Sequence, residues 1–135
     1  MADHGGFSAT YRHGVPWGTL RIEGLGTAGE IPEIDYSESY GAHGEGCLTL
    51  AVAPAEVAVE VTVTTGGTPV DQLIAFAGSL SAPDGVLEIG DLVGDVFAYR
   101  FRVPSGMIDV VVSVDVIEEA TKVGISVPAL IGGAP

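Results

Sequence analysis

The sequence predicts an all-β fold: an antiparallel β-sandwich of the jelly-roll or Ig-like kind with about eight short strands, or alternatively a small barrel. Three observations support this prediction. Apolar and polar residues alternate in several short runs, as they do in half-buried strands. Gly, Pro and Asp residues separate these runs at turn positions. No segment between the runs carries the helical pattern of about a dozen residues that a parallel crossover needs.

Residues 97–115 show the clearest alternation, on both sides of a Pro104-Ser105-Gly106 break. The apolar positions that would share one face of two strands are Phe97, Tyr99, Phe101, Val103, Ile108, Val110, Val112 and Val114. The pattern predicts a hairpin in which Val103 pairs with Ile108 and Arg102 lies opposite Asp109. Such a hairpin would contribute to the hydrophobic core and the scaffold, but it offers no candidate catalytic group.

Shorter runs predict further strands at residues 7–12, 17–23, 31–37, 47–53, 56–65 and 86–89. Two other segments are ambiguous. Residues 70–77 fit a short helix and a strand about equally well. Residues 123–127 fit a last strand, whereas Glu118 and Lys122 have the spacing of a pair that stabilises a helical turn.

Two glycine-rich segments are predicted to connect strands. Residues 24–29 have the Gly-x-Gly-x-x-Gly spacing of a dinucleotide-binding fingerprint, but no amphipathic helix continues beyond Pro32, so a flexible turn is expected. Residues 40–46 are expected to form a loop. The chain is expected to form a single domain over 1–135, with a loosely held C-terminal tail at 128–135.

The formal net charge of −13 arises mainly from missing bases, because 18 acidic residues face only five Lys and Arg residues. Charged residues make up 17% of the chain, below the average of about 25% for soluble domains. A lineage with lysine-poor proteins would give the same balance. Such a chain repels nucleic-acid phosphates and anionic membrane surfaces, so the sequence excludes nucleic-acid and membrane partners. The same charge attracts a basic protein.

Nothing in the sequence indicates export or membrane insertion. The first residues lack the basic and apolar pattern of a secretory signal, and no apolar run is long enough to span a bilayer. Cys47 is the only cysteine, so an internal disulfide is excluded. These features predict a cytoplasmic protein. The mean hydropathy of +0.42 is high for a monomer and favours a homo-oligomer that buries valine-rich surface between subunits.

The segment 33–47 is the candidate interaction site. It places Tyr36 and Tyr40 among carboxylates, and tyrosines offer a large contact area at a low cost in conformational entropy. The predicted contact residues for a protein partner are Asp35, Tyr36, Glu38, Tyr40 and Glu45. A solvated edge strand and loop is the alternative interpretation.

A metal site is another interpretation of the end of this segment. His43, Glu45 and Cys47 would project from one side of an extended chain, and all three are zinc-ligand types. His4 or His13 would complete the coordination. The interleaved glycines favour a mobile loop instead, and a lone cysteine more often serves as a small buried apolar residue.

Arg100 and Arg102 hold two of the five basic side chains on one strand face. One interpretation is an anion clamp, because guanidinium groups bind carboxylates and phosphates with paired hydrogen bonds. The favoured interpretation is that both arginines form ion pairs within the fold. The carboxylates considered for these pairs are Asp109, Asp115, Glu56 and Glu60.

The sequence assigns no catalytic residue and no cofactor, and it favours a non-enzymatic function. We expect an acidic β-sandwich that binds another protein, and its charge favours a basic one, such as a cationic toxin that it would neutralise. Two alternatives stay open. One is a metal-dependent ligand-binding or enzymatic β-barrel, and the other is a structural subunit of a homo-oligomeric assembly.

Overall fold

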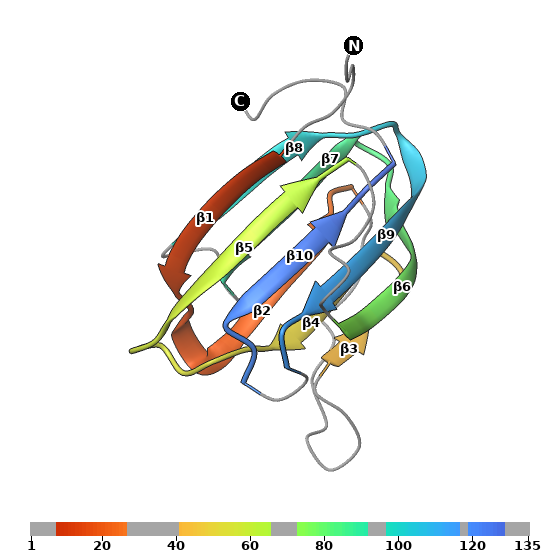
Figure 1. Ribbon diagram of the computed structural model, residues 1–135. Helices are drawn as coiled ribbons and strands as arrows, with labels where there is room; N and C mark the ends of the chain where they lie inside the picture. The colour runs from red at the N-terminus through yellow and green to blue at the C-terminus, as the bar shows by residue number, and fades with distance from the viewer. Residues whose placement is uncertain (1–7, 27–40, 66–72, 92–96, 117–118, 129–135) are drawn as a thin grey trace.

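The computed structural model describes residues 8–26, 41–65, 73–91, 97–116 and 119–128. Within these ranges the chain forms ten strands and one short 3-10 helix, η1 (Pro16–Gly18). The strands build two five-stranded sheets packed face to face (Figure 1), which confirms the predicted β-sandwich. The described strands do not close into a barrel, so the barrel alternative is wrong. No helix in these ranges is long and apolar enough to cross a membrane.

The first sheet has the spatial order β1-β5-β10-β9-β6. Its strands span Ser8–Gly14 (β1), Ala58–Thr64 (β5), Lys122–Ser126 (β10), Gly106–Val114 (β9) and Leu73–Ala82 (β6). The second sheet has the spatial order β3-β4-β2-β7-β8. Its strands span Gly41–His43 (β3), Cys47–Ala51 (β4), Thr19–Gly24 (β2), Val86–Asp91 (β7) and Ala98–Arg102 (β8).

The core lies between the two sheets and follows the predicted alternation. In β5, Val59, Val61 and Val63 are buried, while the intervening Glu60 is only partly covered. In β8, Phe101 is fully buried between two exposed arginines. Each fully buried side chain of this size contributes about 1.5–3 kcal/mol relative to an exposed one. The inward rows of the two sheets therefore supply most of the stability.

The predicted hairpin at 97–115 is wrong, although its apolar face is right. β8 pairs with β7 in the second sheet, whereas β9 pairs with β6 and β10 in the first. Residues 103–106 carry the chain from one sheet to the other, with Gly106 at a φ of 108°. Because the inner faces of the two sheets point at each other, both strands still direct their apolar residues into one core. Arg102 and Asp109 therefore lie in different sheets and do not pair.

Both ambiguous segments are strands where the structure describes them, from residue 73 in the first and from residue 122 in the second. β6 pairs with β9 along its length, with a bulge between Ile74 and Phe76, and β10 occupies most of residues 123–127. β3 corrects the sequence prediction, because residues 41–43 form a strand against β4 where a loop was expected. The predicted strand at 31–37 lies outside the described residues, as does the tail after Pro128.

One pairing departs from a purely antiparallel sandwich. β5 and β10 run parallel, from Glu60 opposite Lys122 to Thr64 opposite Ser126. Consecutive parallel strands need a crossover connection, but four other strands separate these two along the chain. The strands β6 to β9 therefore bring the chain back to the end where β5 begins, so that β10 can run parallel to β5.

Aromatic contacts join the edge strands β1 and β8, which lie side by side on one flank of the sandwich (Figure 1). Tyr11 stacks on Tyr99 with ring centroids 3.7 Å apart, and His13 stacks on Phe97 at 4.5 Å. His13 Nε2 and the Tyr99 hydroxyl also share a hydrogen bond. Each aromatic pair of this kind adds about 0.5–1.5 kcal/mol beyond its buried area. His13, a candidate metal ligand in the sequence, is thus held in the scaffold.

Candidate interaction surfaces

The structure describes only the end of the candidate segment 33–47. Four predicted contact residues lie outside the described residues, so their role stays a prediction: Asp35, Tyr36, Glu38 and Tyr40. Glu45 is exposed in the turn between β3 and β4. Its backbone carbonyl accepts a hydrogen bond from the Ser81 N–H at 2.9 Å, which ties this turn to β6 of the other sheet.

The proposed metal ligands lie along this same turn. His43 ends β3, Glu45 is in the turn, and Cys47 begins β4. Cys47 is buried, and this burial, together with the nearby charge of Glu23, raises the pKa of its thiol to about 12. A zinc-bound cysteine is a thiolate, so metal binding at Cys47 would have to release this proton. The described side chains contain no group of three metal-ligating residues; the metal site stays a prediction.

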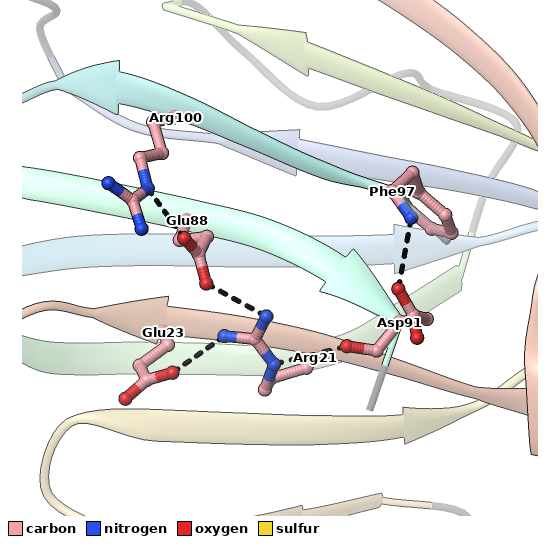
Figure 2. A network of polar contacts seen from close by, with 6 residues as sticks. All are labelled: Arg21, Glu23, Glu88, Asp91, Phe97 and Arg100. Carbon is pink, nitrogen blue, oxygen red and sulfur yellow. Dashed lines mark hydrogen bonds and ion pairs between the residues drawn. The ribbon is translucent and has the colours of Figure 1, made fainter. Parts of the chain in front are cut away.

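A network of ion pairs that the sequence did not predict crosses β2, β7 and β8 (Figure 2). The Arg21 side chain, only 5% exposed, contacts Glu23 at 2.6 Å and Glu88 at 2.8 Å. Its Nε also donates to the Asp91 carbonyl at 3.1 Å. The second carboxylate oxygen of Glu88 accepts a hydrogen bond from Arg100 Nε at 2.6 Å. The four charges alternate along the network and cancel.

Glu88 is the centre of this network, with its side chain 10% exposed. Burial by itself raises the pKa of Glu88, but hydrogen bonds from Arg100 and Arg21 outweigh it and hold the pKa below its usual value. Glu88 is therefore ionised at neutral pH. A carboxylate fixed in one charge state between two arginines is poorly suited to proton transfer, so we assign the network a structural role.

The predicted ion pair of Arg100 with another strand exists, but with Glu88 as its partner. Three of the carboxylates considered for it have other partners. Asp109 accepts a hydrogen bond from Ser79 Oγ at 2.9 Å, and Glu60 contacts Arg12 at 2.6 Å. Asp115 holds the connection between β9 and β10. The sequence signal for one part of the network, the contact of Arg21 with Glu23, is their i, i+2 spacing, which puts both on one strand face.

Asp115 organises the described residues between β9 and β10, namely 115–116 and 119–122, here called the Asp115 loop. Its Oδ1 accepts hydrogen bonds from the N–H groups of Val116, Thr121 and Lys122 at 2.9 to 3.2 Å, and its Oδ2 accepts one from the Thr121 hydroxyl at 2.7 Å. Burial raises the pKa of Asp115, but these hydrogen bonds outweigh it and lower the pKa below its usual value. Glu119 in this loop has a φ of 54°, a conformation that costs a non-glycine residue about 1 kcal/mol or more.

The Asp115→Ala variant is expected to lose about 2 kcal/mol of its free energy of unfolding at neutral pH, because it removes a charged acceptor from four donors. The lowered pKa means that this contribution is complete above the unfolded-state pKa of about 3.9 and disappears as the pH falls through the folded-state value. Urea unfolding at a series of pH values should show the difference from the unmodified protein shrinking below about pH 4. Asp109→Ala, at an exposed site with one side-chain hydrogen bond, is the control and should cost under about 0.5 kcal/mol. A pH-independent difference would contradict this account.

Strands β5, β6 and β10 begin, and β9 ends, at one end of the first sheet (Figure 1). Of the five exposed large apolar residues in the described ranges, all but Met107 lie in or next to these strand ends. Leu73 and Ile74 begin β6, Val116 follows β9, and Val57 precedes β5. Each is between 40% and 53% exposed. We call these four residues the apolar rim. Leu73 pairs with Val114, so the β6 part of the rim lies next to the Asp115 loop.

Exposed carboxylates border the apolar rim. Glu56 precedes Val57, and Glu119 belongs to the Asp115 loop, with both side chains exposed. Two basic residues lie near this end of the first sheet, because Lys122 of β10 and Arg12 of β1 both lie opposite Glu60 of β5. An exposed apolar patch with a charged border is typical of a surface that contacts another protein.

Charge is unevenly distributed along the chain. All five basic residues lie in the described ranges. Eight of the 18 acidic residues lie outside them, namely Asp3, Glu30, Glu33, Asp35, Glu38, Asp71, Asp95 and Glu118. Of the net charge of −13, eight negative charges therefore lie outside the described ranges.

Comparison with known proteins bears on the fold. No family model matches the chain, and no curated protein matches its sequence. Among solved structures, the crystal structure of ComJ from Bacillus subtilis, an inhibitor of the DNA-degrading activity of NucA, matches with a TM-score of 0.66. The match covers 88% of this chain and 93% of the ComJ chain, at 8% sequence identity. At that identity the likeness shows a shared β-sandwich fold and nothing further.

Proposed function

We propose that this chain is a non-enzymatic protein that binds another protein, and that its partner is a basic DNA-degrading nuclease whose activity it blocks. The observation that carries the proposal is the match to ComJ, a nuclease inhibitor, over nearly the full length of both chains. The net charge of −13 supports it. A nuclease binds a polyanion, so its substrate site is basic, and an acidic protein complements that site.

The apolar rim and its carboxylates are the described surface that best fits this partner. Ile74 and Val116 would supply the apolar centre of the contact, and Glu119 would supply charge at its border. The hydrogen bonds of Asp115 hold the backbone of Val116, Thr121 and Lys122 in place before binding, which lowers the entropy cost of association. The proposal keeps the residues predicted from 35–45 as a second and separate contact region, because Glu45 is hydrogen-bonded to Ser81 near the end of β6 and the apolar rim lies where β6 begins.

Partner capture followed by a nuclease assay tests the proposal. The immobilised chain is expected to retain a DNA-degrading nuclease from lysate of the source cells at about 50 mM salt and to release most of it at about 500 mM, because salt screens the contact. The released nuclease should degrade plasmid DNA, and equimolar chain should slow that degradation at least about tenfold. If the chain captured the nuclease but did not slow DNA degradation, it would be a nuclease-binding protein and not an inhibitor.

A pair of matched variants locates the contact. Ile74→Lys puts a positive charge into the apolar rim and is expected to weaken inhibition at least about tenfold. Ser8→Lys adds the same charge at an exposed site at the opposite end of the first sheet, and it should leave inhibition unchanged. If Ile74→Lys has no effect while Tyr36→Ala and Tyr40→Ala abolish inhibition, the contact lies in the segment 33–47 instead.

Self-association is the second candidate function, and strand β6 favours it. β6 is an edge strand of ten residues without a charged side chain, and edges of this kind pair readily with another copy. Its exposed Leu73 and Ile74 would then be buried between subunits. The bulge between Ile74 and Phe76 opposes such pairing. Light scattering on the purified chain decides the matter, since a clean monomer excludes the homo-oligomer.

A further inference from the structure

A cavity of about 410 Å³ opens at the end of the sandwich opposite the apolar rim. It lies beside the end of β8 and the turn that joins β6 to β7. Val86 lines its apolar part with a partly exposed side chain, and Ser105 lines its edge. Phe101 and Val103 also border it, but their side chains are buried in the core. Arg100 and Arg102, which project from one face of β8, also line it. In a chain with five basic residues, this cavity collects two of them.

Arg100 is held in place from behind. Its Nε donates to Glu88, whose other carboxylate oxygen is fixed by Arg21, and Arg21 in turn contacts Glu23 (Figure 2). Glu88 and Arg21 are almost completely buried, so this support is rigid. Since Nε alone of the Arg100 nitrogens is used for this contact, the guanidinium keeps its terminal N–H groups for another acceptor.

Arg102 has a different environment. Its side chain is exposed, and no carboxylate of the described residues lies within 4.0 Å of it. Asp84 lines the same cavity, but its carboxylate packs against Gly26, where a Cβ would lie 2.7 Å from Oδ1. The ion-pair interpretation of the two arginines therefore holds for Arg100 and not for Arg102 in this part of the chain.

We propose that this cavity binds a small oxyanion ligand, an organic carboxylate or phosphate, between Arg100 and Arg102. The Cα atoms of residues i and i+2 on a strand are about 6.8 Å apart, a span that one oxyanion can bridge with a guanidinium on each side. Guanidinium groups are suited to such ligands because they donate paired, charge-assisted hydrogen bonds. The partly exposed side chain of Val86 would contact the carbon skeleton of the ligand.

Titration of the isotope-labelled full chain with inorganic phosphate and, separately, with citrate tests this proposal at constant ionic strength. Saturable shifts of the Arg100 and Arg102 Nε–H signals are expected with at least one probe, and the probe that saturates identifies the ligand class. Arg102→Gln should weaken binding at least about tenfold, whereas Asp84→Asn should strengthen it by removing a like charge. Arg12→Gln, at an exposed arginine of the other sheet, is the matched control and should bind as the unmodified chain does.

Shifts that stay linear with both probes, or that are equal in Arg102→Gln and the unmodified chain, would overturn the oxyanion site. Spectra of each variant show directly that it is folded, so loss of binding is not mistaken for unfolding. The site is independent of nuclease inhibition, because it lies at the other end of the sandwich. Arg102→Gln should leave inhibition unchanged, and failure of either proposal does not affect the other.

Discussion

The Arg21→Met variant is expected to lose about 3–5 kcal/mol of its free energy of unfolding. Methionine keeps the length and the apolar contacts of the arginine stem but removes the charge that Glu88 faces. Glu88 is 10% exposed, so its carboxylate would lose one of its two cationic partners while staying out of water. Small domains are stable by about 5–15 kcal/mol, so this loss is a large share of the total. Urea unfolding at neutral pH measures it.

Two further variants separate charge from packing. Arg12→Met removes an exposed arginine from its ion pair with Glu60 and should cost under about 1 kcal/mol, because exposed pairs contribute little. The double variant Arg21→Met with Glu88→Leu removes both buried charges and should regain much of the loss. An Arg21→Met variant as stable as Arg12→Met would contradict the structural role of the network. A double variant less stable than Arg21→Met would indicate that packing is the main contribution.

The faces of the strands could be predicted from the sequence, but their neighbours could not. Alternation in 56–65 and 97–115 states which residues are buried, and the structure confirms this for Val61 and Phe101. It does not state which sheet a strand joins, since both sheets of a sandwich bury one face in the same core. A short connection at Pro104-Ser105-Gly106 is compatible with a hairpin and with a crossing between sheets. The structure selects the crossing.

The polar sites were harder to predict for a related reason. Arg21 and Glu88 lie on the strand faces that point away from the core, so the alternation predicts exposure, yet both are buried. Their pairing depends on β2 lying next to β7, a neighbour relation that no local pattern carries. The apolar rim likewise forms only when the ends of three strands, distant in sequence, meet at one end of a sheet. The acidic segment 33–47 is different, because its composition alone identifies it as a candidate contact region.

The Gly24→Ala variant is expected to lose about 2–4 kcal/mol of its free energy of unfolding. A Cβ at Gly24 would lie 2.2 Å from the Ser81 carbonyl oxygen and 2.9 Å from the Ala82 Cβ. Both neighbours are buried at the end of β6, so β2 of one sheet touches β6 of the other at this glycine. Neither strand can move aside alone, because the Gly24 N–H donates to the Gly46 carbonyl and the Ser81 N–H donates to the Glu45 carbonyl.

Gly44→Ala provides the matched control for this contact. A Cβ at Gly44 would meet only the Cys47 carbonyl oxygen among nearby atoms, at 3.9 Å, which is ordinary contact. Its cost should stay within about 0.5 kcal/mol. Thermal and urea unfolding measure the stability of both variants. If Gly24→Ala lost as little free energy of unfolding as Gly44→Ala, the sheet-to-sheet contact would be contradicted. Gly24 begins the segment whose spacing resembled a nucleotide-binding fingerprint, and on this account it is a glycine because two backbones meet there and leave no room for a side chain.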